Sequence, residues 1–556
     1  MTTVKHMKWW GWGVEGVQFE YHNKPNFAPF VKEAVDLDLE VEPADIDAPD
    51  LDRLRLPDSL ISAAQLARLT ELVGDAHVTT ERLERVTHTY GKSIRDLLRL
   101  RDGSIARVPD VVVYPGTEAE VQQIVDLAVD QDAVLIPFGG GTNISGSLEP
   151  LPEETRPIIS LDLGRMNRVL EVDEQSGLAR VQAGTLGPDL EEQLGDRGWT
   201  MGHFPDSFTH STLGGWVATR SSGMQSDKYG DIAEITRGLR VVVPRRTLVI
   251  RPLPGTSTGP SVREMILGSE GRLGVITEVT VQIHRLPTER QVLGYLFPDW
   301  QAGLAAMEEI ASSDASPSVT RVSDARETGF SFATRKKGKK VSGAVSAALM
   351  KVLERKGWDL EKLCLSFIGY EGSKRHVGYE KNLVRQIVRK HGGILLGKGP
   401  GTLYDQKKFD TPYIRDFLLD RGAAADVSET AAPWSRLRDL YAGTVAAANA
   451  AYREIGVRGW IMCHLSHSEH SGACLYFTFA FRHDDNDPIG RYEVVKTAIQ
   501  QAFIDNGGTL SHHHAVGREH APWIEQDLSP AGADMLRGLF ESVDPKRNLN
   551  PGKIVF

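Results

Sequence analysis

The chain has 556 residues and a net charge of −10, with 41% hydrophobic and 25% charged residues. This composition is typical of a soluble globular protein of about two to four domains, and the acidic balance argues against nucleic acid as a partner, since such proteins carry a basic excess. Three cysteines without a CxxC pair exclude a disulfide framework and a thiolate metal site, and they fit a reducing compartment.

The first hundred residues are charged and helix-prone, and we predict an N-terminal helical segment over residues 1–106. The opening residues MTTVKHMKWWGWGVEG lack the apolar core of a secretory signal. No apolar run approaches the ~18 residues that cross a bilayer. We therefore expect a cytoplasmic protein with at most peripheral contact to a membrane.

Residues 107–286 have the pattern of an α+β domain. Their first part, from Pro109 to Gly146, is predicted to form a strand, a helix, a second strand and a glycine loop. Thr117 and Glu120 have the spacing of a capping box at the start of that helix. Short β-rich runs and glycine turns follow, and many short strands after one βαβ unit indicate an α+β fold.

Residues 287–506 alternate longer helices and strands, which predicts a second domain. The last fifty residues, 507–556, again contain glycine-rich turns, and we expect them to return to the first domain.

The glycine loop PFGGGTNISG, from Pro137 to Gly146, follows a predicted strand, where phosphate-binding loops occur. Consecutive glycines let backbone N–H groups approach a diphosphate closely. The loop is not the G-x-G-x-x-G fingerprint, because Asn143 or Ile144 stands where a glycine is required and no helix follows. A plain tight turn is the alternative. Three further glycine segments, residues 205–223, 228–232 and 268–277, favour a polar ligand.

The motifs together, in their order, resemble those of the FAD-linked oxidases with the vanillyl-alcohol-oxidase fold, and within them the alkyldihydroxyacetonephosphate synthases. The resemblance runs nearly end to end and rests on KWWGWG, PFGGGTNISG, GHFPDS, STLGGWVATRSSGM, GSEGRLGVITE, GACLYFTFAF and SHHHAVG. It implies a PCMH-type FAD-binding domain joined to an α+β cap domain that receives the substrate.

The same resemblance implies FAD as the cofactor. The flavin is expected to be noncovalent, because no histidine or cysteine that could tether it lies in the glycine loop. The residues expected to line it are Pro137, Gly139, Gly140, Gly141, Thr142, Asn143, Ser145, Gly146, Pro205, Asp206, Ser207, Thr212, Gly214, Gly215, Ser222, Gly223, Glu270, Gly271, Gly274 and Ile276.

Three consecutive histidines, His512, His513 and His514, offer groups that titrate near neutral pH. In an extended strand His512 and His514 would share one face and His513 the other. A surface run or a metal site is the alternative. The resemblance places the histidines beside the flavin and implies that His513 and His514 transfer protons. The family's glycine after them is Ala515 here.

The run GACLYFTFAF alternates like a strand with one apolar face. Phe477, Phe479 and Phe481 form that face, and Tyr476 lies on the other with small residues. We therefore expect Tyr476 to face a site, with a core tyrosine as the alternative. The resemblance implies that Tyr476 is catalytic.

Upstream, His464, His467 and His470 offer possible metal ligands. Related 2-hydroxyacid dehydrogenases use a pattern like H-x-G-D-G-N-x-H there, and the chain lacks its GDGN core. We predict no metal.

Arginine suits a substrate phosphate because its planar fork matches phosphate oxygens. Arg321 corresponds to an active-site arginine of the family, while Arg415 and Arg436 are weaker candidates for which a surface ion pair is the default. The basic run RKKGKK at 335–340 is either a solvated loop or a lip that meets anionic lipid.

The resemblance implies an alkylglycerone-phosphate synthase-like enzyme. It would exchange the acyl group of acyl-dihydroxyacetone phosphate for a long-chain alcohol, with no net redox change. The alternatives are an FAD-dependent 2-hydroxyacid dehydrogenase or oxidase, and a silent flavin- or lipid-binding paralogue. A lipid-like substrate and a homodimer are expected.

Overall fold

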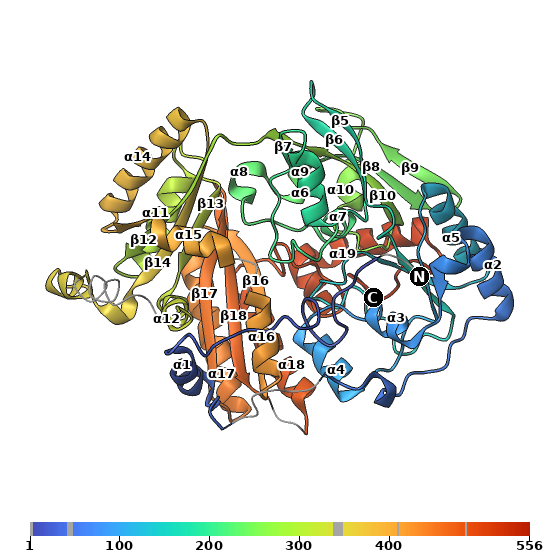
Figure 1. Cartoon of the computed structure of the whole chain (residues 1–556), viewed down its shortest axis with the longest axis horizontal. Coiled ribbons are helices and arrows are strands. Elements are labelled where there is room, and N and C mark those ends of the chain that lie inside the picture. The colour runs from blue at the N-terminus through green and yellow to red at the C-terminus, as the bar shows by residue number, and fades with distance from the viewer. Residues whose placement is uncertain (1–3, 42–47, 337–348, 408–410, 484–485) are drawn as a thin grey trace.

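The computed structural model describes residues 4–41, 48–336, 349–407, 411–483 and 486–556. Figure 1 shows two parts side by side: several small sheets with short helices on one side, and one large sheet with long helices on the other. Strand β11 (His284–Arg285) is the last strand of the first part, and β12 (Glu289–Phe297) begins the large sheet.

The first sheet has the order β1-β2-β4-β3, in which β2, β4 and β3 run parallel. The predicted strand, helix, strand and glycine loop are confirmed, and the Thr117 side chain caps the helix by accepting from the Glu120 N–H at 3.2 Å. The elements are β1 (Val78–Thr79), β2 (Val111–Val113), α5 (Glu118–Asp130), β3 (Val134–Phe138) and β4 (Ile158–Asp162).

The second sheet is antiparallel, in the order β5-β6-β10-β8-β9, and it shares one apolar core with the first. A short pair joins β11 to β7. The elements are β5 (Val169–Asp173), β6 (Leu178–Gln182), α6 (Gly187–Gly195), β7 (Trp199–Thr200), α7 (Leu213–Thr219), α8 (Ser226–Tyr229), α9 (Ile232–Ile235), β8 (Thr236–Val243), β9 (Arg246–Ile250), α10 (Val262–Ile266) and β10 (Val275–Gln282).

The large sheet has seven antiparallel strands in the order β15-β12-β14-β13-β17-β18-β16. Its central strands pack on helices through a second apolar core. The elements after β12 are α11 (Trp300–Ala311), β13 (Val319–Ser323), α12 (Ala325–Ala333), β14 (Cys364–Gly372), α14 (Lys374–Lys390), β15 (Ile394–Gly397), α15 (Lys398–Lys407), α16 (Thr411–Leu419), β16 (Ala423–Pro433), α17 (Leu437–Glu454), β17 (Gly459–Ser468), β18 (Gly472–Arg482) and α18 (Pro488–Asp505).

The N-terminal segment is less helical than predicted, because residues 4–26 form turns and β1 pairs with β2. Its first helix lies beside the large sheet, against β17 and α12 (Figure 1). The segment therefore contacts both parts of the molecule. Its helices are α1 (Phe27–Val35), α2 (Ala63–Val73), α3 (Arg82–Thr87) and α4 (Ile94–Asp102).

The C-terminal residues return to the first part of the molecule after α19 (Ile524–Val543). The Leu135 N–H donates to the Asn548 carbonyl at 2.7 Å, and the Asn550 N–H donates back to Leu135 at 2.9 Å. No helix in the described part of the chain is both long and apolar enough to span a bilayer.

Candidate active site

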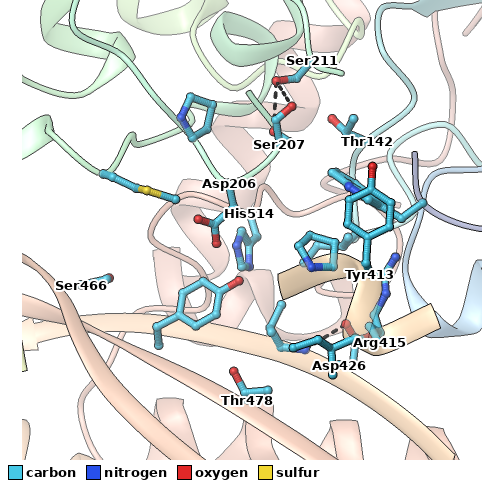
Figure 2. Close-up of a pocket in the computed structure, with 18 of the residues that line it drawn as sticks. Thr142, Asp206, Ser207, Ser211, Tyr413, Arg415, Asp426, Ser466, Thr478 and His514 are labelled. Carbon is cyan, nitrogen blue, oxygen red and sulfur yellow. Dashed lines mark hydrogen bonds between the residues drawn. The ribbon is translucent and has the colours of Figure 1, made fainter. Parts of the chain in front are cut away.

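A cavity of about 1050 Å³ lies where the two parts meet. Figure 2 shows side chains that face it from both, among them Asp206, Arg415 and His514. Ligand pockets usually measure roughly 300–1,000 Å³. The cavity is therefore large enough to hold a cofactor together with a substrate.

The flavin side of the cavity is lined by most of the residues predicted for it. Three are not at the wall: Ser145 is buried, with its carbonyl accepting from the Arg518 N–H at 2.9 Å, and Gly146 and Gly223 are also off the lining. The lining residues are Pro137, Gly139, Gly140, Gly141, Thr142, Asn143, Pro205, Asp206, Ser207, Thr212, Gly214, Gly215, Ser222, Glu270, Gly271, Gly274 and Ile276.

The glycines of the loop present backbone to this cavity, and Thr142, Asn143 and Ile144 line it beside them. A Cβ on Gly140 would overlap the carbonyl oxygen of His210, and Gly141 has φ +65°, a conformation that favours glycine. Exposed backbone at a strand end is the geometry that receives a diphosphate. These residues therefore fit the diphosphate of FAD.

Glu270 ties the C-terminal return to the same wall. Its Oε1 accepts the N–H groups of Val516 and Gly517, each at 2.9 Å, and the Asn550 side chain donates to its carbonyl at 2.6 Å. Glu270 is therefore a cavity residue whose carboxylate is already used by the backbone of the returning segment.

The three histidines do not form the extended strand that we expected. They follow a bend around one buried carboxylate, Glu429, which accepts from the backbone N–H groups of His512, His513 and His514 at 2.8, 3.0 and 3.0 Å. Because of this bend, His513 and His514 both line the cavity and His512 does not. The expected arrangement, with His513 alone on the opposite face, is wrong.

Burial lowers the pKa of both His513 and His514 below the usual value for histidine, so both are neutral near pH 7. For Glu429, burial would raise the pKa, but the neighbouring His512, whose own pKa is raised, and the backbone N–H groups that donate to the carboxylate outweigh burial and hold the pKa of Glu429 well below its usual range. The cavity thus contains neutral imidazoles held by a permanent anion.

Strand β18 alternates as predicted. Phe477, Phe479 and Phe481 are buried in the core of the large sheet, and Tyr476, Thr478 and Ala480 line the cavity, which Phe479 also reaches. The Tyr476 ring centroid lies 5.4 Å from that of His514. Burial raises the pKa of Tyr476 well above its usual value, so its phenol is protonated near pH 7, beside neutral imidazoles.

Arg321, on β13, lies in a buried cluster that the sequence did not reveal. Its Nη2 donates to Glu327 Oε1 at 2.5 Å, and Glu327 Oε2 lies 2.8 Å from His464 Nδ1. Arg321 Nη2 also lies 3.1 Å from this Nδ1, so the nitrogen is close to both a donor and an acceptor. The His464 ring stacks on Tyr476 with centroids 4.9 Å apart.

Glu327 was missed because its position has an ordinary explanation in the sequence. It lies three residues after Asp324, the N-cap of α12, whose side chain accepts from the Glu327 N–H at 2.7 Å. A D-x-x-E pattern predicts only helix capping. The second role of Glu327 depends on His464, from a strand far along the chain.

Of the two weaker arginine candidates, only one lies at the cavity. Arg415, on α16, lines the cavity, and its Nη1 donates to the Lys92 carbonyl at 2.6 Å. Arg436 lies instead at a small separate hollow with Asp439 and Asn506. The structure therefore does not bring Arg436 to the site.

The upstream histidines also separate. His464 and His467 line the cavity, whereas His470 is exposed. Donor atoms of Glu429, Cys474, His512 and His513 do lie within 4.8 Å of one another. The Glu429 oxygens, however, are engaged by three backbone N–H groups.

Comparison with known proteins identifies the family. Residues 109–250 match the FAD binding domain, and residues 286–554 match the C-terminal domain of FAD linked oxidases. The chain is 41% identical over 476 residues to an alkyldihydroxyacetonephosphate synthase of Dictyostelium discoideum, covering 85% of this chain and 78% of the relative. The chain belongs to the alkyldihydroxyacetonephosphate synthase family. The predicted resemblance is confirmed.

Solved structures agree with the family. A structure of an alkyldihydroxyacetonephosphate synthase matches 98% of each chain with a TM-score of 0.84 and 34% identity. A structure of p-cresol methylhydroxylase with substrate bound covers 90% of this chain and 98% of its own, with a TM-score of 0.68 and 15% identity, and confirms the α+β fold. As a member of the synthase family, the chain is an FAD-dependent enzyme.

Proposed function

We propose that the chain is an alkylglycerone-phosphate synthase that converts acyl-dihydroxyacetone phosphate and a long-chain alcohol into an ether lipid precursor. The exchange breaks the bond between the substrate carbon and the acyl oxygen and forms a bond from that carbon to the alcohol oxygen. The alcohol proton leaves with the carboxylate, so no oxidant is consumed. When bound, FAD supplies the electron-accepting ring system at which the substrate carbon reacts.

The observation that carries this proposal is that apolar residues line a large part of the cavity wall. From the polar cluster around Tyr476 its wall extends over two separate apolar clusters, as two long hydrocarbon chains require. A small 2-hydroxy acid would need neither. One surface comes from Phe27, Phe30, Val31, Ala34, Val35, Phe330, Ile414, Leu418 and Trp460, and the other from Leu365, Phe367 and Leu396.

The polar residues between these surfaces have complementary roles in the proposal. Tyr476 donates a proton, and His514, with His513, accepts one, because the phenol is protonated and the imidazoles are neutral. Arg321 and Arg415 bind the phosphate. Glu327 holds Arg321 and His464 in place.

The proposal is tested by mass spectrometry of the products formed from palmitoyl-dihydroxyacetone phosphate and hexadecanol. The expected products are hexadecyl-dihydroxyacetone phosphate and one palmitate per ether. Bleaching of the flavin by D-lactate or glycolate, with no ether formed, would assign the site to a 2-hydroxyacid dehydrogenase. Inertness towards both sets of substrates would favour a silent paralogue.

We also propose that the enzyme is a homodimer that touches anionic membranes through RKKGKK. Arg335 and Lys336 are exposed at the cavity mouth, and residues 337–340 lie outside the described part of the chain. Binding to anionic vesicles should weaken with salt, because exposed charges are screened within about 10 Å at 0.1 M. Equal binding to neutral vesicles would mean that RKKGKK is an ordinary solvated loop, and a monomeric mass in sedimentation would contradict the dimer.

The domain limits at 106/107, 286/287 and 506/507 also remain a proposal. Limited proteolysis of the holoenzyme should cut near them if they mark separately folded units, and persistent cutting elsewhere would contradict them.

A further inference from the structure

The KWWGWG loop, residues 8–13, is the one motif of the sequence that the proposed chemistry does not use. Its chain reverses on itself, and the Lys8 N–H donates to the Gly13 carbonyl at 2.8 Å. Trp9 and Trp12 are each only 4% exposed. Trp12 also lines the cavity, with its ring edge-on to His210. The loop is thus part of the cavity's surroundings, not a free end.

The loop is fixed to helix α16 through Asp416. The backbone N–H of Trp12 donates to Asp416 Oδ2 at 2.5 Å, and Lys8 Nζ lies 3.5 Å from the same oxygen. A Cβ on Gly11 would overlap that oxygen, and a Cβ on Gly13, at φ +73°, would overlap the Tyr413 hydroxyl. The two glycines of W-G-W-G are therefore what allow the loop to lie directly against α16.

Asp416 immediately follows Arg415, which lines the cavity. Arg415 Nη1 donates to the Lys92 carbonyl at 2.6 Å. Its Nε and Nη2 are buried without a hydrogen-bond partner among the described residues, and Nη2 lies 3.7 Å from Asp416 Oδ1. Figure 2 shows this side chain beside Tyr413 and Asp426. Two unsatisfied donors of a rigid fork are the geometry that binds phosphate oxygens.

Lys92 joins the loop to both sides of the site. Its buried ammonium donates to the carbonyls of Lys8 and Trp9 at 2.9 and 3.2 Å. The backbone N–H of Lys92 donates to the Asn143 carbonyl of the glycine loop at 2.7 Å, and the Lys92 carbonyl accepts from Arg415 Nη1. One residue thus connects the tryptophan loop, the glycine loop and the arginine.

We propose that the KWWGWG loop is a positioning element that holds α16 and Lys92 so that Arg415 presents its free donors to the substrate phosphate. In this proposal the loop does not itself bind the phosphate. It acts through Asp416 and Lys92 on Arg415. This inference rests on the proposed function for the identity of the phosphate substrate.

Isothermal titration calorimetry of the holoenzyme with glycerol 3-phosphate, a phosphate monoester that lacks the acyl group, tests this inference without relying on turnover. Arg415→Ala removes the fork and should weaken binding about ten-fold or more, the effect expected for losing charged hydrogen bonds. Gly11→Ala forces the loop away from Asp416 and should weaken binding about ten-fold while FAD content stays normal. Gly378→Ala, in α14 where no atom lies within 4 Å of the added Cβ, is the matched control.

The double variant separates positioning from general damage. If the loop acts through Arg415, Gly11→Ala should add little to the loss already caused by Arg415→Ala. Asp416→Asn keeps the size of the side chain and loses its charge, so it should show a smaller loss with the same non-additivity. It decides the question if Gly11→Ala does not fold.

An unchanged affinity in Gly11→Ala and Asp416→Asn would overturn the inference. Equal losses with and without Arg415, or no binding by the wild-type holoenzyme, would also overturn it. If the coupling appears but no ether product forms, the proposed function fails and this inference stands. If ether forms and the coupling is absent, the inference alone fails.

Discussion

The two walls of the cavity are built in different ways. The flavin wall presents backbone at its glycines, and Gly140 lies so close to the His210 carbonyl that an added Cβ would overlap its oxygen. On the opposite wall ionisable side chains meet: half-buried Arg321 and the buried Glu327 and His464, which two strands and a helix bring together. The comparison indicates that the flavin wall depends on close approach of backbone at glycines, whereas the opposite wall depends on contacts between charged and polar side chains, one of which joins distant parts of the chain.

The largest expected effect is on the flavin wall. Gly140→Val would place a branched side chain against the His210 carbonyl, so the loop should open and the flavin should be lost. The ratio of visible to ultraviolet absorbance of the purified protein measures this. Retention of a full complement of flavin would mean that the glycine loop does not carry the cofactor.

The wild-type protein provides the companion measurement. It should be yellow, and acid or heat should release free FAD, because the glycine loop has no histidine or cysteine to form a bond. Flavin that remains with the denatured chain would contradict noncovalent binding.

Away from the glycine loop, Tyr476→Phe and His514→Ala should each lower turnover by roughly 10²-fold, the usual contribution of a positioned acid or base. Their FAD content should stay near normal, which sharpens the contrast with Gly140→Val. Turnover with palmitoyl-dihydroxyacetone phosphate and hexadecanol is the measurement. Near wild-type rates in both variants, with flavin retained, would remove these residues from the chemistry.

Arg321→Lys keeps the charge and loses the planar fork. If Arg321 anchors phosphate, the KM for acyl-dihydroxyacetone phosphate should rise with little change in kcat. A loss confined to kcat would instead assign Arg321 to charge that develops in the transition state.

The next prediction concerns Glu327 and how the stability of the folded protein depends on pH. Burial would raise the pKa of Glu327, but His464 and Arg321 outweigh it and hold the pKa at about 2. Because this folded-state value is below the ordinary one, the stabilisation is present above about pH 4.5 and is lost as the pH falls towards 2. Glu327→Gln should cost about 3 kcal/mol at neutral pH, as removal of one partner of a buried ion pair does.

Urea unfolding across this pH range checks the sign. The difference between wild type and Glu327→Gln should shrink as the pH falls below 4.5. A difference that stays constant with pH would show that the carboxylate charge does not stabilise the cluster.

The smallest effect is at the turn after the histidines. Ala515 has φ +69°, a left-handed conformation that costs an alanine about 1–2 kcal/mol. Ala515→Gly relieves this strain, but glycine also gives the unfolded chain more conformational entropy, which offsets part of the gain. The protein should therefore be more stable by about 0.5–1 kcal/mol. Thermal unfolding measures it. A lower melting temperature would mean that the Ala515 side chain stabilises the turn.

The local features could be predicted from sequence because each depends on neighbouring residues. The helix after Thr117 and the two faces of the strand at Tyr476 follow from capping and from the two-residue repeat. The bend at His513 could not, because Glu429 precedes it by 84 residues. Glu327 was hidden by its capping position. The apolar surface that α1 contributes was also missed, because the sequence of an amphipathic helix does not show what its apolar face packs against.

The central claim is that the two walls together perform an alkyl exchange without net oxidation, and anaerobic turnover tests it most directly. Yellow holoenzyme is incubated without oxygen with palmitoyl-dihydroxyacetone phosphate and excess hexadecanol, while ether, palmitate and the flavin spectrum are followed. The account predicts many turnovers, equal amounts of ether and palmitate, and oxidised flavin at the end. Product limited to one equivalent per flavin, with the flavin left reduced, would contradict it.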